Sequence, residues 1–235
     1  VRFNLHGNSI KIIFSYFFKV VLMMFNNRQD AGNQLAKYLV SYQNHSNAIV
    51  LGLSYGGMPI AFEMAQLLHL PFHTLIVRKI RSPQNSTLSL GAIAEQEIEL
   101  LNADLIGILD IPNDYIRKEL ESQKIHLARQ AKSYHISERL LYQKQILLVD
   151  DGMATGSSMQ VAIQALKKLQ VASIHLAVPI ASHSSLAKIS KEVQISCLFS
   201  PSFFAKISDF YHNFEPVSDL EVTHFLNSSR DLATI

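Results

Sequence analysis

The sequence predicts a single α/β domain in which a mainly parallel sheet is flanked by helices. Two segments, residues 48–68 and residues 146–166, each show an apolar strand, then a glycine-rich turn, then a helical period. Units of this kind build parallel sheets that carry helices on their faces. The chain has 235 residues, of which 48% are hydrophobic and 17% charged, so it has material for one large core and too little charge for disorder.

The first 23 residues are expected to form an extension outside the functional domain, which then spans residues 24–235. Residues 10–25 are apolar, but Lys11 and Lys19 interrupt the run. Because a membrane helix needs about 20 continuous apolar residues, we expect no membrane segment here. No small-residue cleavage site follows, which argues against a signal peptide.

Periodicity and turn residues predict the remaining elements in order. They are a helix at residues 28–42, a strand at 48–51, a helix through Ile60, Met64 and Leu68, a strand at 74–77, a polar loop at 82–87, a strand at 90–94, an extended segment at 105–111, a long helix at 113–135, and strands at 173–178 and 193–199. Ser218 and Glu221 have the spacing of a capping box, which predicts a last helix. Aromatic residues are dense at 201–214, where core packing and a hood over a flat ligand are the two alternatives.

The most informative stretch is residues 146–158, I-L-L-V-D-D-G-M-A-T-G-S-S. Its apolar run ends in Asp150 and Asp151, at the strand end where ligands of open α/β sheets bind. Two carboxylates can accept hydrogen bonds from a vicinal diol such as that of ribose, and the following turn offers N–H groups and hydroxyls to a phosphate. That turn consists of Gly152, Met153, Ala154, Thr155, Gly156, Ser157 and Ser158. Each residue alone is common in structural turns and caps, so the whole pattern carries the prediction of a phosphosugar site.

This stretch resembles the phosphoribosyl pyrophosphate motif of type I phosphoribosyltransferases, which has four apolar residues, two acidic ones and a loop ending in T-G-x-S/T. The resemblance implies a Rossmann-like core with a small hood. It also implies that Asp150 and Asp151 hold the ribose hydroxyls, and that residues 152–158 hold the 5′-phosphate of phosphoribosyl pyrophosphate (PRPP).

A donor with pyrophosphate at its other end requires a second anion site. The candidate is the turn after residues 48–51, with Ser54, Tyr55, Gly56 and Gly57 as its binding residues. Alone this turn is a weak indication, because glycine-rich turns between strand and helix are frequent. Three cations follow a predicted strand, and Arg78 and Lys79 are expected to assist catalysis. Arg81 is expected to lie in a flexible loop, residues 80–90, that closes as a lid beside the active site.

Most of the chain beyond the first two dozen residues is similar to a group of small bacterial phosphoribosyltransferase-like proteins. The similarity runs from F-N-N-R-Q-D-A-G at residue 25 to the aromatic pattern near Tyr211. Two positions depart from that group: Ser54 and Tyr55 replace a proline and an arginine, and a basic stretch is reduced to Arg129, Lys132 and His135. Both departures remove positive charge from the expected pyrophosphate end.

The implied activity is transfer of the 5-phosphoribosyl group from PRPP to a nitrogen nucleophile, a nucleobase or related heterocycle, with release of pyrophosphate. Asp150, Asp151, Lys79 and Arg78 are the expected catalytic residues. Magnesium is the implied cofactor, bound through PRPP and with Asp150 and Asp151 as candidate protein ligands. The alternative is a regulatory protein that senses PRPP or a nucleotide without turnover, since fold does not dictate function.

Composition limits the partners. A formal charge of +2 with no basic run argues against nucleic acid, and Cys197 is the sole cysteine, which favours a reducing cytoplasm. The expected partners are PRPP and an unidentified small-molecule acceptor, with no membrane. The resembled fold also makes a homodimer an open expectation.

Overall fold

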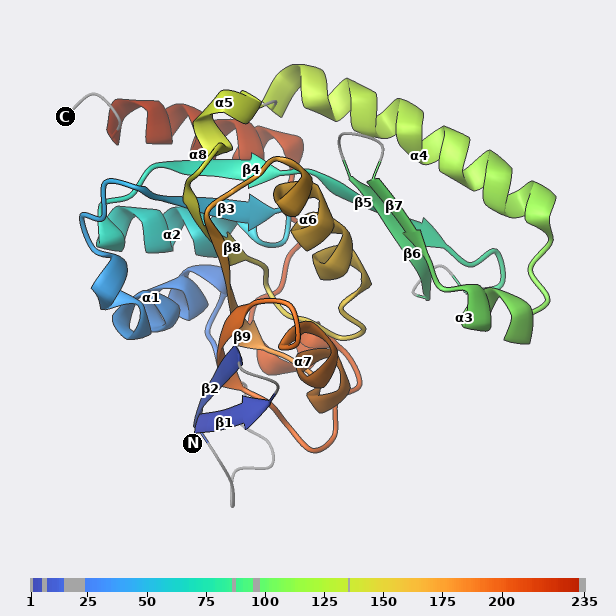
Figure 1. Cartoon of the computed structure of the whole chain (residues 1–235), viewed down its shortest axis with the longest axis horizontal. Coiled ribbons are helices and arrows are strands. Elements are labelled where there is room, and N and C mark those ends of the chain that lie inside the picture. Colours follow the sequence, from blue (N-terminus) through green and yellow to red (C-terminus); the bar gives the residue numbers. More distant parts are fainter. Residues whose placement is uncertain are drawn as a thin grey trace.

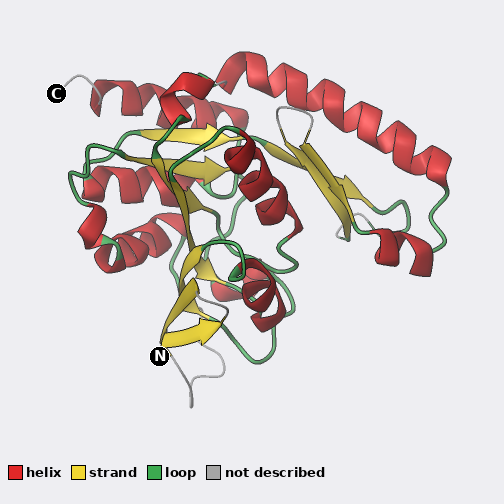
Figure 2. Ribbon diagram, viewed as in Figure 1, coloured by secondary structure: helices red, strands yellow, loops and turns green. Residues whose placement is uncertain are grey.

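The computed structural model describes residues 2–5, 8–14, 24–85, 88–94, 98–134 and 136–232. Its centre is a twisted sheet with helices on both faces (Figures 1 and 2). The strand order is β1 (Arg2–Leu5), β2 (Asn8–Phe14), β10 (Gln194–Phe199), β9 (Ser173–Ile180), β8 (Gln145–Val149), β3 (Ala48–Leu53) and β4 (Phe72–Leu75). Every pair from β2 to β4 is parallel, and β1 joins β2 antiparallel.

The central strands send alternate side chains into two cores, as the period of two in a strand requires. On β3, Ala48 and Val50 pack with α1 (Arg28–Tyr38), α2 (Met58–Leu68) and α8 (Asp219–Leu232). Ile49 and Leu51 point the other way, into the core that holds α6 (Ser157–Lys168) and α7 (His183–Ile189). Strands buried on both faces explain why β3 and β8 are unbroken apolar runs. The predicted α/β fold with a mainly parallel sheet is confirmed.

A second, antiparallel sheet of β5 (Val77–Arg81), β6 (Ser89–Ala94) and β7 (Ile98–Leu101) follows β4 directly. It lies between α6 and the long helix α4 (Asn113–Tyr134), which runs along one side of the molecule (Figure 1). The short helices α3 (Ala103–Ile108) and α5 (Glu138–Leu141) flank α4 in the chain. This layer therefore places the cation-bearing strand β5 beside the end of the main sheet.

Several expected elements are confirmed. The long helix lies at Asn113–Tyr134 and the strands near residues 90, 173 and 193 are present as β6, β9 and β10. The capping box is formed: the N–H of Ser218 donates to Glu221 Oε2 at 2.8 Å, and the N–H of Glu221 donates to Ser218 Oγ at 3.3 Å. Local sequence was sufficient for these elements because each one carries its own period or cap.

Other expectations were wrong. Residues 105–111 are not extended, since Ala103–Ile108 form α3, whose first turn is capped by Asn102 Oδ1 accepting from the N–H of Leu105 at 3.1 Å. The helix predicted at 28–42 ends at Tyr38 and gives way to the 3₁₀ turn Val40–Tyr42. Another 3₁₀ turn, Ile207–Phe210, lies in the aromatic stretch.

The lid predicted over residues 80–90 is also different. Residues 80, 81, 89 and 90 belong to the paired strands β5 and β6, and Ile80 and Leu90 are both fully buried in a core shared with α4. These four residues, Arg81 included, therefore belong to a strand pair and not to a loop. Of the predicted polar loop, residues 86 and 87 lie outside the described residues.

Part of the expected N-terminal extension pairs with the main sheet, because β2 runs parallel to β10. Residues 15–23 are outside the described part of the chain. Within the described part, no helix combines the length and the apolarity needed to cross a membrane.

Candidate active site at the carboxyl ends of β3 and β8

The predicted acidic pair follows β8 directly, and Asp151 is held in a buried ion pair. Its Oδ2 atom accepts from Arg28 Nε at 3.0 Å and from Arg28 Nη2 at 2.9 Å, and Asp151 is 8% exposed. Arg28 is the first residue of α1 and is equally buried, at 8%. A charge-assisted bond of this kind fixes the orientation of the carboxylate.

Arg28 also connects the acidic pair to the C-terminal segment. Its Nη1 donates to the carbonyl of Glu215 at 2.8 Å, and its guanidinium carbon lies 3.8 Å from the centre of the Phe214 ring. The Tyr211 hydroxyl donates to the backbone carbonyl of Asp151 at 2.7 Å. Three distant parts of the chain therefore meet at Asp151, held by one guanidinium and one phenol.

Arg28 is a residue of the site that was not predicted from the sequence. A clue was present, because Arg28 shares a helical face with Ala31 and Leu35, both fully buried. A charged residue on an apolar helical face requires a buried partner, so this position could have been found.

Asp150, the other carboxylate of the pair, is influenced by the charges of Asp151 and Lys79. Its Oδ1 accepts from the N–H of Asp151 at 2.9 Å. Burial raises the pKa of Asp150 well above its ordinary value, the Asp151 carboxylate raises it further, and the Lys79 ammonium opposes the effect. Burial also raises the pKa of Asp151, and Arg28 opposes that rise. Burial thus opposes the charge of both carboxyl groups, and the cations Arg28 and Lys79 offset part of that effect.

The predicted cations Arg78 and Lys79 separate in the structure, because neighbouring residues of a strand point to opposite faces. Lys79 lies close enough to lower the pKa of both carboxyl groups. Arg78 turns to α4, where its Nε donates to Gln123 Oε1 at 2.6 Å and its Nη1 to Gln130 Oε1 at 3.1 Å. Of these three predicted cations, Lys79 is therefore the one that acts on the acidic pair. Arg81 ends β5 and is exposed, and its carbonyl accepts from the Tyr115 hydroxyl at 3.0 Å.

The predicted 5′-phosphate turn, residues 152–158, connects β8 to α6. Gly156 has φ +77°, which disfavours any side chain, and a Cβ at Gly152 would lie 2.8 Å from Ile207 Cγ2. Gly156 is the N-cap residue of α6. Because glycine has no side chain, it cannot satisfy the first N–H groups of that helix with a side-chain acceptor. Ala154 and Thr155 are exposed, Ser157 and Ser158 are half-buried, and Met153 is buried.

Two serines that no sequence pattern had marked support this turn: Ser182, the N-cap of α7, and Ser185 within that helix. Ser182 Oγ donates to the carbonyl of Ala154 at 2.6 Å, and Ser185 Oγ donates to the carbonyl of Met153 at 2.9 Å. The N–H of Met153 donates to the carbonyl of Ile180 at 2.9 Å. These bonds come from β9 and α7, so no local pattern near the turn could reveal them.

The predicted pyrophosphate turn touches the acidic pair. A Cβ on Gly56 would lie 2.5 Å from Asp151 Oδ2, and one on Gly57 would lie 2.3 Å from the carbonyl oxygen of Val149. Ser54 has φ 51°, and its Oγ donates to the carbonyl of Val77 at 2.7 Å, which ties the turn to the start of β5. Glycine is therefore required at both positions, because Asp151 and the Val149 carbonyl lie too close to leave room for a side chain.

Tyr55 projects from the same turn into a polar network. Its hydroxyl donates to Asp219 Oδ1 and accepts from Gln130 Nε2. The Tyr134 hydroxyl also donates to Asp219 Oδ1, at 3.2 Å. Burial and then Asp219 raise the pKa of Tyr55 to about 12, so the hydroxyl stays neutral.

The aromatic residues of the segment 201–214, for which core packing and a hood over a ligand were the two alternatives, differ in their burial. Tyr211 is 2% exposed and packs on Phe25 with ring centroids 5.2 Å apart, which is core packing. Phe214 is half-buried against Arg28, close to the acidic pair, while Phe203 is 82% exposed.

Whether Mg²⁺ fits this site depends on which side chains can donate oxygen ligands to it. In the described part of the chain, no group of three or more His, Cys, Asp or Glu side chains could hold a metal ion by itself. Asp150 and Asp151 still fit a secondary role, because Mg²⁺ is usually held by one or two carboxylates together with phosphate oxygens and water. Asp151 Oδ2 already accepts two bonds from Arg28, so Asp150 is the better-placed donor.

Residues 24–215 match the model of the phosphoribosyl transferase domain. The chain belongs to this family. The match includes the acidic pair, both turns and Arg28, and it begins at the residue where the functional domain was expected to start. The type I phosphoribosyltransferase fold predicted from the motif is thereby confirmed.

Two proteins of Mycobacterium tuberculosis, both assigned by name as phosphoribosyl transferases, are 34% identical to this chain over 216 residues, or 90% of its length. The chain spans about half the length of these relatives, 48%. The crystal structure of a Thermus thermophilus protein has 28% identity and a TM-score of 0.69, over 88% of this chain and 99% of that one. The fold is therefore similar to that of the Thermus protein over almost all of that protein's length.

Proposed function

We propose that this protein transfers the 5-phosphoribosyl group of PRPP to a nitrogen nucleophile, a nucleobase or a related heterocycle, and releases pyrophosphate. The observation that carries the proposal is the contact between the two turns: Gly56 of one approaches Asp151, which opens the other. A single ligand with a diol in its middle and an anion at each end matches this arrangement.

Each group then has one role. Asp150 and Asp151 Oδ1, to which no described residue is recorded as donating a hydrogen bond, accept the ribose hydroxyls, while residues 152–158 bind the 5′-phosphate with N–H groups at the start of α6. The C1–O bond to pyrophosphate breaks with its electron pair leaving on oxygen, and the acceptor nitrogen forms the new bond and loses a proton to solvent. Lys79 stabilises the negative charge that collects on the leaving group, and positioning supplies most of the remaining rate enhancement.

Magnesium fits this scheme as a cation brought by the diphosphate. When bound, it neutralises charge on the departing pyrophosphate. Asp150 is the protein group that we assign to it, and Lys79 limits the negative potential at the acidic pair.

The test is pyrophosphate release from PRPP and Mg²⁺ across a panel of nucleobases, heterocyclic amines and aromatic acids. We expect one acceptor class to support turnover and Asp150→Asn to lower kcat by at least about 100-fold, since charge placed at a reacting centre has effects of that size. If no acceptor is used and the Asp150→Asn plus Asp151→Asn double variant binds ribose 5-phosphate like the native protein, the assignment fails.

A sensor that binds PRPP or a nucleotide without turnover is the second candidate. It is supported by the turn at residues 54–57, which carries no cation and whose Tyr55 is bound to Asp219 and Gln130. Calorimetry with PRPP, paired with the turnover assay, separates the two: saturable binding with no pyrophosphate release for any acceptor would favour the sensor.

A further inference from the structure

Arg28, at the start of α1, is bound to two segments that lie far from it in the chain. Its Nε and Nη2 donate to Asp151 Oδ2 at 3.0 and 2.9 Å, and its Nη1 donates to the carbonyl of Glu215 at 2.8 Å. The guanidinium carbon also lies 3.8 Å from the centre of the Phe214 ring. Arg28 is 8% exposed, so the group is largely shielded from water. The C-terminal segment therefore holds the guanidinium that Asp151 binds.

The carboxylate of Asp151 is enclosed on several sides. Arg28 donates twice to Oδ2, and a Cβ on Gly56 would lie 2.5 Å from the same oxygen, so the backbone of that turn lies against the carboxylate. The Tyr211 hydroxyl, in a residue that is 2% exposed, donates to the backbone carbonyl of Asp151 at 2.7 Å. These contacts fix one orientation of the carboxylate, in which Oδ1 receives no hydrogen bond from the described residues.

The acidic pair then offers one open oxygen on each residue. Asp150 Oδ1 accepts from the N–H of Asp151 at 2.9 Å, and within the described part of the chain Asp150 Oδ2 accepts no hydrogen bond. A vicinal diol has two hydroxyl donors at a fixed separation, so it needs two acceptors held at a matching separation. Rotation of the Asp151 carboxylate would remove that match. The orientation of Asp151 therefore decides whether the pair can distinguish a diol.

We propose that Arg28 is a positioning residue that gives this site its preference for a sugar with a vicinal diol. The proposal rests on the proposed function. Arg28 acts through Asp151 and makes no contact with the sugar, and residues 211–215 extend the positioning by holding Arg28. A planar guanidinium suits this role because its paired N–H donors fix a carboxylate oxygen in direction, whereas an ammonium group is a point charge.

The probes are ribose 5-phosphate and 2,3-dideoxyribose 5-phosphate, which differ in the diol, and calorimetry on the whole chain is the readout. We expect the native protein to prefer ribose 5-phosphate by at least about 10-fold, the usual effect of a hydrogen bond to a charged group. Arg28→Gln should reduce this preference about 5-fold or more without changing the affinity for the dideoxy sugar, and Arg28→Lys should restore part of it. Arg117→Gln is the control, because that exposed arginine pairs with Asp114 and should leave the preference unchanged.

Two further variants test the route through Asp151. Once Asp151→Asn is present, adding Arg28→Gln should reduce the preference no further, because two changes that act through one group are not additive. Phe214→Leu keeps Arg28 but removes the ring beside its guanidinium, at a half-buried position. It should lower the preference about 2- to 3-fold, as expected for the loss of a cation–π contact.

A native preference in Arg28→Gln would overturn the proposal. If that variant does not fold, a native preference in both Arg28→Lys and Phe214→Leu would overturn it. A further loss of preference when Arg28→Gln is added to Asp151→Asn would do so too, because Arg28 would then act independently of Asp151. Equal weakening of the two sugars would show a structural role alone and would also overturn it. A native protein that does not distinguish the two sugars would contradict the ribose site of the proposed function itself.

Discussion

The guanidinium of Arg28 and the carboxylate of Asp151 form a buried ion pair with a nitrogen–oxygen distance of 2.9 Å. The two residues are 123 positions apart, so the pair joins the first helix of the domain to the residue that is proposed to hold the ribose. The pair matters to stability mainly through the cost of breaking it, because loss of either partner leaves the other charge buried and uncompensated.

Arg28→Gln should therefore lower the free energy of unfolding by about 3–5 kcal/mol, the range for breaking one half of a buried ion pair. Urea denaturation at pH 7 measures the change. Arg117→Gln is the control, because its surface pair with Asp114 is worth less than about 1 kcal/mol. Equal losses in the two variants would show that Asp151 does not depend on Arg28.

Gly56→Ala should disturb the acidic pair directly. The added Cβ would lie 2.5 Å from Asp151 Oδ2, and Arg28 prevents that carboxylate from moving aside. Overpacking of this kind costs about 1–3 kcal/mol, and ribose 5-phosphate binding should weaken in parallel. Gly107→Ala is the control: no heavy atom lies within 4 Å of its Cβ, and in the helix α3 alanine should stabilise by about 0.5–1 kcal/mol. A Gly56→Ala protein with native stability and affinity would contradict the contact.

Asp150→Asn should stabilise the free protein while it weakens ligand binding. The pKa of Asp150 is raised in the folded state, so the native state holds the proton more tightly than the unfolded state does, and stability is lost as the pH rises through the raised pKa. Removing this charge should increase Tm at pH 7 by about 2–4 °C, as expected for roughly 1 kcal/mol in a chain of this size. Thermal unfolding at several pH values measures the effect, which should vanish at low pH. A lower Tm at every pH would contradict it.

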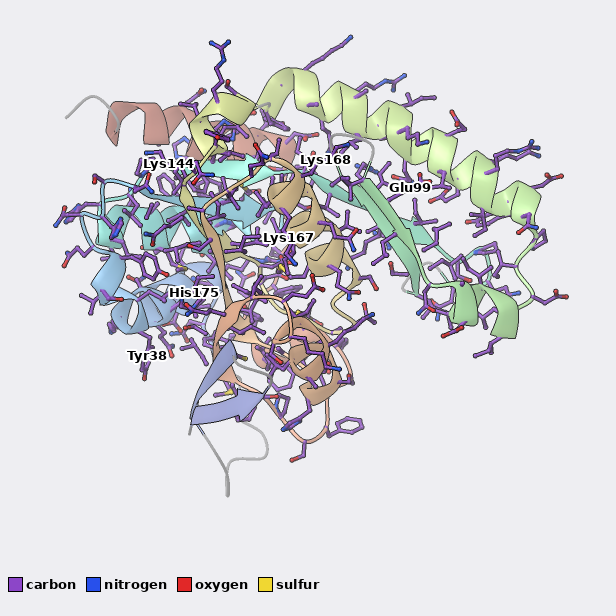
Figure 3. All side chains as sticks on the ribbon, in the orientation of Figure 1. Tyr38, Glu99, Lys144, Lys167, Lys168 and His175 are labelled. Carbon is purple, nitrogen blue, oxygen red and sulfur yellow. The ribbon has the colours of Figure 1, made fainter. Side chains whose placement is uncertain are left out.

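His175 should make stability fall in mild acid. It is half-buried on β9, where Figure 3 labels it, and its Nδ1 meets the Tyr42 hydroxyl at 3.1 Å and its Nε2 meets Ser196 Oγ at 3.0 Å. Burial lowers its pKa from 6.5 to about 4. Stability from this neutral side chain is complete above pH 6.5 and is lost as the pH falls toward 4, a change on the order of 2–3 kcal/mol.

His175→Gln should flatten the dependence of unfolding free energy on pH between 6.5 and 4. His183→Gln, a change of an exposed histidine at the start of α7, should leave the slope as it is. Parallel urea titrations at four pH values make the comparison. An unchanged slope in His175→Gln would assign the acid sensitivity to other groups.

The sequence by itself determined the elements and the chemistry that are written locally. The apolar run before Asp150 and Asp151, the glycine turns and the capping box at Ser218 are each complete within a dozen residues, and the structure contains them all. Extended structure was wrongly predicted at residues 105–111, because the apolar residues there pack on one side of the short helix α3, whose period is harder to see in six residues.

Tertiary structure decided which of these groups meet. Arg28 reaches Asp151 because α1 packs against α2 and β9, and Arg78 leaves the acidic pair because β5 pairs in a separate sheet that meets α4. Contacts between residues so far apart in the chain depend on strand order and register, and no local period specifies either. The motif at residues 146–158 thus predicted the family and the proposed sugar-phosphate end of the site, whereas the partners of its two carboxylates depended on the fold.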